Sequence, residues 1–276
     1  MYDLHTHSSF SDGAVHPEKM ALYAKEQGLS GFALTDHDTM RGVEEARKTA
    51  KAVGIDVIDG CELSAYDPDT GRKVHLLVYM PQNPEALDEI FKKVQKSREE
   101  ACLRSIEVLK KHYPITEDEV RLIAGGGTLF RTHIMLALME RGYADRVFGD
   151  TYEHIFSKDS GIASFAVDYT PMEDAARAAR ESGGFISLAH PGVYDSFGSC
   201  VKLCEKGLLD GIEADYPRIL SHEIKLVNEL AERFSLIKTG GTDFHGFYST
   251  PPHPMGKGRV SLETIFEMRK LTEKRK

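Results

Sequence analysis

Histidine and carboxylate residues in this 276-residue chain stand mainly where short apolar runs stop. A buried acid needs a partner and a buried imidazole needs an acceptor or a metal ion, so such residues are rarely kept for packing alone. If the apolar runs are strands that end on one rim, the dispersed residues meet in one pocket. The pattern therefore predicts a polynuclear metal site. The residues are His5, His7, Asp36, His37, Asp38, Glu62, His75, His190, Glu213, Asp243 and His245.

The apolar runs alternate with helical patterns over most of the chain. Helices are expected at about 17–27, where Pro17 stands near the start and Gly28 near the stop, and at about 40–53. Seven strands alternating with helices predict a parallel α/β barrel, in which the C-terminal ends of the strands build the active site. The predicted strands are residues 2–4, 31–35, 55–58, 74–79, 185–188, 209–212 and 236–238.

The alternation stops between residues 84 and 165. We expect residues 1–83 and 166–276 to form the barrel and residues 84–165 to form a helical insertion that acts as a lid. A packing appendage with a solvated, charged face fits its charge content as well. Residues 125–127 are three glycines without a following Lys-Ser/Thr, so they predict a helix stop and hinge. The inserted helices are expected at about 87–112, 116–124 and 132–142.

The composition is ordinary for a globular protein, with 41% hydrophobic and 28% charged residues. The N-terminus lacks a basic segment followed by an apolar one, and no run approaches the roughly 20 apolar residues that span a bilayer. We therefore expect a cytoplasmic protein with no membrane partner. The four cysteines are scattered and are expected to be buried free thiols.

The formal net charge of −8 argues against binding to duplex DNA. It does not argue against phosphate chemistry, because divalent cations held by the clustered acids would make the pocket attractive to anions. A small phosphorylated substrate or a short single-stranded nucleic acid is the expected ligand. No obligate protein partner is evident.

Two pairs of residues have the spacing of shared metal ligands. His5 and His7 lie two apart on an extended segment, so both side chains leave the same face. Asp243 and His245 have the same spacing after a glycine pair near the other end of the chain. Asp12 stands in a turn that could swing its carboxylate toward the first strand, although an Asp that makes its own turn is the simpler interpretation of that residue alone.

Five short motifs resemble, in order, those of the polymerase and histidinol phosphatase (PHP) superfamily: His5-x-His7, Thr35-Asp36-His37, Gly60-Cys61-Glu62, Ala189-His190-Pro191 and Asp243-x-His245. The resemblance spans nearly the whole chain. It implies a distorted seven-stranded (β/α)7 barrel with a trinuclear metal centre that hydrolyses phosphate esters by a metal-activated water. It also implies three ligand sets: His5, His7, Glu62 and Asp243; Glu62, His75 and His190; and Asp12, His37 and His245.

The cofactors implied are three divalent metal ions. Imidazole and carboxylate ligands suit manganese, iron or zinc, and the sequence does not choose between them. No serine nucleophile elbow and no phosphate-binding loop is present, so covalent serine hydrolysis and nucleotide-triphosphate switching are unsupported.

Further motifs resemble the small bacterial phosphoesterases related to nucleoside 3′,5′-bisphosphate phosphatases and 5′-exoribonucleases. They are Thr35 to Thr39, Phe130-Arg131-Thr132-His133 and Leu188 to Gly192. Those proteins more usually have Arg-Pro-His where this chain has Arg131-Thr132-His133. This chain has both polar residues of that motif but lacks its proline, so a different local turn is possible.

Several residues are candidates for catalysis or substrate binding. Arg131 and His133 are expected to contact a phosphate; alternatively, Arg131 pairs with a surface acid and His133 caps a helix. His190 is the third catalytic candidate, and Lys158 is a further phosphate contact. Glu213 and Tyr216 are expected either to contact substrate or to support a ligand and pack.

We therefore expect a metal-dependent phosphatase or short-substrate exonuclease that acts on a nucleoside 3′,5′-bisphosphate or a short oligonucleotide. A cyclic phosphodiesterase that opens a sugar cyclic phosphate could use the same metals. Histidinol phosphatase is a third possibility, which the inserted helices disfavour. A non-catalytic accessory PHP module, as found in polymerases, is disfavoured by the intact set of ligands.

Overall fold

Seven strands form one continuous curved sheet in the computed structural model, which describes residues 1–249 and 251–275. The strand order is β1-β2-β3-β4-β6-β7-β8, and the short strand β5 pairs with β3 beside this path. The predicted α/β fold is confirmed. The strands are β1 (Tyr2–Thr6), β2 (Gly31–Leu34), β3 (Asp56–Tyr66), β4 (Lys73–Tyr79), β5 (Thr170–Pro171), β6 (Phe185–Leu188), β7 (Gly211–Asp215) and β8 (Ile237–Gly240).

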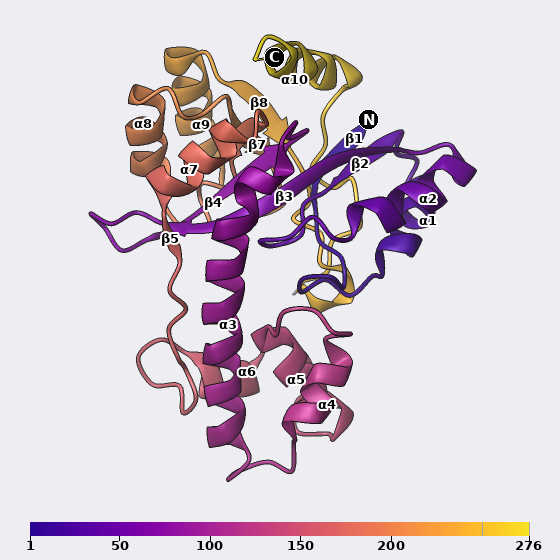
Figure 1. The fold of residues 1–276 in the computed structure, drawn as a ribbon, viewed down its shortest axis with the longest axis vertical. Coiled ribbons are helices and arrows are strands. Elements are labelled where there is room, and N and C mark those ends of the chain that lie inside the picture. The colour runs from indigo at the N-terminus through magenta and orange to yellow at the C-terminus, as the bar shows by residue number, and fades with distance from the viewer. Residues whose placement is uncertain (250, 276) are drawn as a thin grey trace.

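Helices cover the outer side of the sheet because each has one apolar face. α1 begins with Pro17, whose fixed φ suits a first helical turn, and α2 ends at Gly54, which takes the left-handed φ of 75°. Both helices pack with Phe32 and Leu34 of β2. Figure 1 shows this pair on one flank of the sheet and α7 to α9 on the other. The bounds are α1 (Pro17–Glu26), α2 (Val43–Val53), α7 (Met172–Glu181), α8 (Phe197–Glu205), α9 (Ser221–Phe234) and α10 (Leu262–Glu273).

The prediction of an all-parallel barrel is wrong at β4. This strand runs antiparallel to both β3 and β6, because a tight connection over residues 67–72 returns the chain beside β3. In that connection Gly71 has a φ of 68° and its N–H bonds to the carbonyl of Asp67 at 2.8 Å. The reversal brings His75, near the start of β4, to the rim where the parallel strands end.

The chain that follows β8 closes the sheet against β1. The N–H of Phe244 donates to the carbonyl of His5 at 3.2 Å, and the N–H of His7 donates to the carbonyl of Phe244 at 2.8 Å. Gly241 permits this approach, since a Cβ there would lie 2.4 Å from the Cβ of His5. Gly241 belongs to the glycine pair that precedes Asp243, and its close approach to His5 gives a packing reason for a glycine at this position.

The helices of the inserted region have a hydrophobic core of their own, which includes Ile106, Leu109, Leu129, Ile134 and Leu138. Figure 1 shows the long helix α3 running from the sheet to the group formed by α4, α5 and α6. α4 begins at a capping box made by Thr116 and Glu119. The bounds are η1 (Pro84–Leu87), α3 (Asp88–Leu109), α4 (Glu117–Ile123), α5 (Arg131–Glu140) and α6 (Asp150–Phe156), with η2 (Gly246–Tyr248) after β8.

Within the described residues, no helix combines the length and the apolar character needed to cross a membrane.

Asp210 joins three parts of the barrel through its carboxylate. It accepts hydrogen bonds from Arg180 of α7 at 3.0 Å and from the N–H of Ile186 in β6 at 2.9 Å, and it pairs with Arg275 after α10. We predict that Asp210→Asn lowers the free energy of unfolding by about 2 kcal/mol, because both arginines lose their charged partner. Urea unfolding measures the change. The exposed Asp159 provides a control, since Asp159→Asn should leave stability unchanged within about 0.5 kcal/mol; equal stabilities of the two variants would contradict this account.

Candidate metal centre

Glu62 lies at the centre of the rim and is completely buried. Its position within β3, which is longer than predicted, brings its carboxylate against the ends of four other strands. Burial raises the pKa of this carboxyl, but the surrounding imidazoles lower it by more than burial raises it. The pKa is therefore held well below its usual range. The two oxygens of Glu62 lie 2.8 to 3.3 Å from ring nitrogens of His5, His7, His37, His75 and His190.

Three groups of side chains at this rim have the geometry of metal ligands. Within each group, one donor atom per residue lies within 4.8 Å of all the others. The groups are His5, His7, Glu62 and Asp243; His7, Asp12, His37 and His245; and His37, Glu62 and His75. The structure thus brings the nine predicted ligands together, with His190 3.0 Å from Glu62. Two groups differ from the predicted ligand sets. His7 joins the set of Asp12, His37 and His245, and His37 stands in place of His190 beside Glu62 and His75.

The residues at this rim fit divalent metal ions. Several of their buried nitrogen and oxygen atoms have no hydrogen-bond partner within the described part of the chain, which is costly unless a ligand or an ion satisfies them. The donors are imidazole nitrogens and carboxylate oxygens without a thiolate, a set that suits manganese, iron or zinc. The atoms include His5 Nε2, both ring nitrogens of His7, Asp12 Oδ1, His37 Nδ1, Glu62 Oε2 and His190 Nδ1.

Buried carboxylates hold the predicted ligands in place. Glu213 lies 3.1 Å from the Nδ1 of His5 and accepts the backbone N–H of His190 at 2.7 Å. Asp36 accepts hydrogen bonds from Ser8 and Ser11, which fixes the loop that leads to Asp12. These contacts set the ring and loop orientations that a metal site needs.

Three residues of the rim have left-handed backbone conformations, which are unfavourable for residues other than glycine. Asp38, His190 and Asp243 have φ values of 53°, 24° and 53°. Asp38 follows the predicted ligand His37, and the other two are predicted ligands themselves. Strained residues persist where the surrounding contacts determine them, and they cluster at functional sites.

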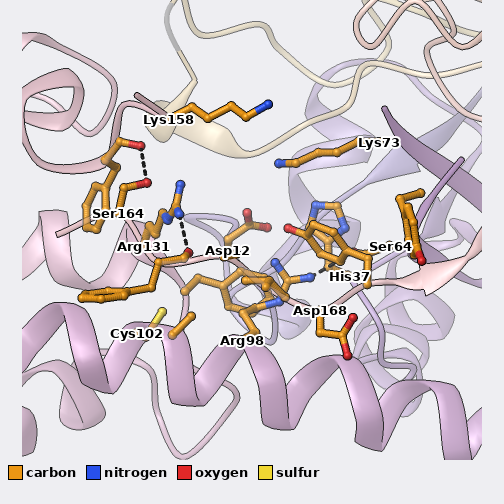
Figure 2. Close-up of a pocket in the computed structure, with 18 of the residues that line it drawn as sticks. Asp12, His37, Ser64, Lys73, Arg98, Cys102, Arg131, Lys158, Ser164 and Asp168 are labelled. Carbon is orange, nitrogen blue, oxygen red and sulfur yellow. Dashed lines mark hydrogen bonds between the residues drawn. The ribbon is translucent and has the colours of Figure 1, made fainter. Parts of the chain in front are cut away.

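A cavity of about 1040 Å³ opens beside the rim, between the barrel and the inserted helices. Asp12, His37 and His75 line its wall on the barrel side. Figure 2 shows Lys73 and Lys158 extending toward each other across this space, and Arg131 lines the same cavity. The remaining wall contains aromatic rings, among them Phe148, Tyr152, Tyr169 and Tyr194.

Arg131 and Lys158 therefore lie where a substrate phosphate could reach them. The guanidinium of Arg131 donates to the carbonyl of Phe165 at 2.9 Å and lies over the ring of Phe156. These contacts fix its direction, and among the described residues no acidic side chain forms an ion pair with it. Lys158 is exposed at the edge of the cavity.

His133 is buried and is not among the residues that line the cavity, although a phosphate contact was predicted for it. Its Nδ1 accepts the N–H of Phe130 at 3.1 Å, and the backbone of Ser11 lies beside the ring. Burial lowers the pKa of His133 to about 4, so the ring is neutral at pH 7. The alternative interpretation, a residue that caps α5, is the one observed.

Glu213 and Tyr216 are also buried away from the cavity. Glu213 is completely buried behind His5, and the hydroxyl of the buried Tyr216 accepts the N–H of Gly192 at 3.0 Å. Neither residue lines the cavity. Their predicted alternative roles, supporting a ligand and packing, fit these positions.

Three cations that line the cavity escaped the sequence analysis: Arg72, which pairs with Asp195, and Lys73 and Arg98. Lys73 stands two residues before His75, so strand alternation places both on one face, and this spacing could have revealed it. Arg98 is one of many charged residues on α3, and nothing in the sequence distinguishes it. It lines the cavity and bonds to Asp38 at 2.8 Å.

A family model described as the PHP domain matches residues 3–162 of the chain. A phosphoribosyl 1,2-cyclic phosphate 1,2-diphosphodiesterase of Eggerthella lenta is 34% identical over 91% of this chain and 96% of its own length. A 3′,5′-nucleoside bisphosphate phosphatase of Chromobacterium violaceum is 28% identical over 88% of this chain and 86% of its own.

A solved structure has the same overall fold. It is a Bifidobacterium adolescentis protein assigned as a metal-dependent phosphoesterase, which superposes with a TM-score of 0.89 at 27% identity. The match covers 98% of this chain and 96% of that one.

Replacing the central carboxylate tests the geometry of this rim. We predict that Glu62→Gln binds fewer divalent ions and loses activity by about two orders of magnitude or more, because the amide removes the negative charge shared by neighbouring ions. Elemental analysis and circular dichroism measure metal content and fold. The exposed Glu26 provides a control through Glu26→Gln. A Glu62→Gln protein with normal metal content and turnover would show that the ligands are assigned wrongly.

Proposed function

The chain belongs to the PHP domain family, and on that premise we propose that it hydrolyses a phosphate ester of a small sugar- or nucleotide-based substrate that carries a second phosphate. One observation carries this proposal: a single cavity has predicted metal ligands in one wall and the cations Lys73, Arg131 and Lys158 around the rest. A phosphoryl group at the metals leaves room in the cavity for another anionic group beside those cations.

The proposal assigns the rim to three divalent cations, of manganese, iron or zinc, held by the nine predicted ligands. Bound there, such ions supply an activated water and neutralise the oxygens of the reacting phosphate. His190, predicted to act in catalysis, contacts Glu62 at 3.0 Å and is assigned as a ligand. Residues 1–83 and 166–276 then form the catalytic unit, and residues 84–165 form the substrate-binding insertion.

Arg131 orients the second phosphate in this proposal. Its guanidinium is held by the Phe165 carbonyl, so an anion approaching from the cavity meets a fixed donor and loses little freedom on binding. Lys73 and Lys158 add positive charge at the entrance, where their flexible side chains suit a charge of variable position. The aromatic wall excludes water and offers flat surfaces to a sugar or a base.

Two substrate classes fit this arrangement, and both place two phosphates on one small molecule. A nucleoside 3′,5′-bisphosphate matches the phosphatase relative at 28% identity. A cyclic phosphate of a phosphorylated sugar matches the cyclic phosphodiesterase relative, whose identity of 34% extends over nearly all of both chains. The higher identity makes the cyclic ester the first substrate to test.

An accessory role without catalysis and a histidinol phosphatase activity are both less well supported. At the rim, each predicted ligand has a donor atom within 4.8 Å of a donor atom of another predicted ligand. Histidinol phosphate carries one phosphate and a positive amine, which the cations Lys73, Arg131 and Lys158 would repel.

We predict that metal-reconstituted protein hydrolyses at least one substrate of the two-phosphate class faster than histidinol phosphate or a plain aryl phosphate. The panel contains a cyclic phosphate of a phosphorylated pentose, nucleoside 3′,5′-bisphosphates, short 5′-phosphorylated RNAs and the two single-phosphate esters, assayed by release of phosphate or ring opening. Because remote binding energy should favour the doubly charged substrates, equal or higher kcat/KM for the single-phosphate esters would contradict the proposal.

Arg131→Ala should retain metal but lower kcat/KM by about two orders of magnitude on the preferred substrate, as expected when a charge-assisted contact of roughly 2 to 3 kcal/mol is deleted. The loss should be smaller on an aryl phosphate, which has no second anion. Arg104→Ala is the matched control, because Arg104 lies on α3 over the ring of Phe165 and outside the cavity. Unchanged kinetics of Arg131→Ala on every substrate would reduce the insertion to a packing element.

A further inference from the structure

One of the three ligand groups is built mostly from loops. Asp12 lies after β1, His37 after β2 and His245 after β8. By contrast, Glu62 lies within β3 and His75 within β4. Loops need additional contacts to hold side chains at metal-binding distances. The inserted helices contact each of the three loops.

The first contact is with Asp38, the residue after His37. Gln95 of α3 donates to its backbone carbonyl at 2.7 Å, and Arg98 of α3 donates to its carboxylate at 2.8 Å. Asp38 has the unfavourable φ of 53°, so these bonds support a conformation that the residue would not adopt alone.

Arg98 is held firmly enough to act as such a support. Its side chain is only 12% exposed and also donates to the hydroxyl of Ser64 at 2.9 Å. The guanidinium lies 4.5 Å from the ring centre of Phe130, the residue that precedes α5, and that ring stacks at 6.2 Å on His37. The same arginine therefore joins α3, the start of α5 and the loop that carries His37.

The second contact is with the loop that carries Asp12. Because the Nδ1 of His133 accepts the N–H of Phe130, its Nε2 bears the proton, and this side of the ring lies beside the backbone of Ser11, next to Asp12. The third contact is with the segment after His245, where Tyr248 packs against the hydrophobic core of the inserted helices.

The barrel also contributes to the loops of Asp12 and His37, through Asp36 and through the N–H of Ser64, which donates to Asp38 at 2.8 Å. The other ligands are supported from within the barrel. Glu213 of β7 orients His5 and the backbone of His190, and Asp3 of β1 accepts the N–H groups of His5 and Thr242. We infer that the inserted helices position the Asp12–His37–His245 site, with Arg98 and His133 as positioning residues, so that this site alone depends on the insertion for tight binding of its divalent cation. The inference rests on the proposed trinuclear centre.

The test is a titration of metal-stripped, full-length protein with Mn²⁺, followed by calorimetry and by electron paramagnetic resonance of free Mn²⁺. In Arg98→Met and in His133→Leu, one binding step should weaken by about 10- to 100-fold while the other two stay within about threefold of wild type. Arg98→Lys, which keeps a cation near Asp38, should recover part of the loss. Arg104→Met on the same helix is the control and should bind like wild type.

Asp12→Asn separates failure of the inference from failure of the proposed centre. If Asp12→Asn removes one binding step and both Arg98→Met and His133→Leu retain all three, the inference is wrong and the trinuclear centre stands. If Asp12→Asn changes no binding step, the assignment of that site fails and the inference fails with it. Equal weakening of all steps in the folded Arg98 and His133 variants, checked by circular dichroism, would likewise overturn it.

Discussion

A single buried carboxylate surrounded by five imidazoles is the constraint on which the rest of this structure depends. Glu62 is inaccessible to solvent, and ring nitrogens from five histidines lie within 3.3 Å of its oxygens. Such a concentration of polar groups is unfavourable in a protein interior unless each group is satisfied. The strands supply the histidines, the reversed β4 adds His75, and the chain after β8 closes on β1 to bring Asp243 and His245. The fold thus brings histidines that are far apart in the sequence into contact with the one carboxylate of Glu62.

The sequence predicted this centre better than the surroundings of the centre. The motif His5-x-His7 places two donors on one face of an extended segment, so local periodicity was sufficient to identify that pair. Asp243 and His245 have the same spacing but lie beyond β8, where Asp243 has a left-handed φ of 53°. The direction of β4 was not predictable in this way, because a short apolar run reads the same in parallel and antiparallel neighbours. The motif of His133 suggests a phosphate contact, and only the fold shows that its Nδ1 caps α5 at Phe130 and that the ring lies beside Ser11. In the sequence, Arg98 is one of many charged residues on α3. Only the packing of α3 against the barrel shows that it contacts Asp38.

In the proposed function, the barrel binds the metals and the inserted helices recognise the substrate. The two parts are connected where Arg98 of the insertion contacts Asp38 of the barrel. The barrel holds most of the predicted ligands through its own carboxylates, including Glu213 and Asp36. The inserted helices contribute Arg131 to the cavity and, through Arg98, contact the loop of His37. On the proposed assignment, a change in the insertion has two distinct consequences, one for the affinity of a remote phosphate and one for the metal ion of the Asp12–His37–His245 site. Variation in the insertion would alter substrate choice while leaving the inner part of the centre intact.

The central claim is that several metal ions share Glu62, and an anomalous-scattering measurement on crystals grown with Mn²⁺ tests it most directly. Data collected near the manganese absorption edge locate the ions independently of any activity assay. The account predicts three anomalous peaks at the rim, two of them beside the separate oxygens of Glu62 and the third beside Asp12, His37 and His245. A single peak, or none in contact with Glu62, in fully loaded crystals would contradict it.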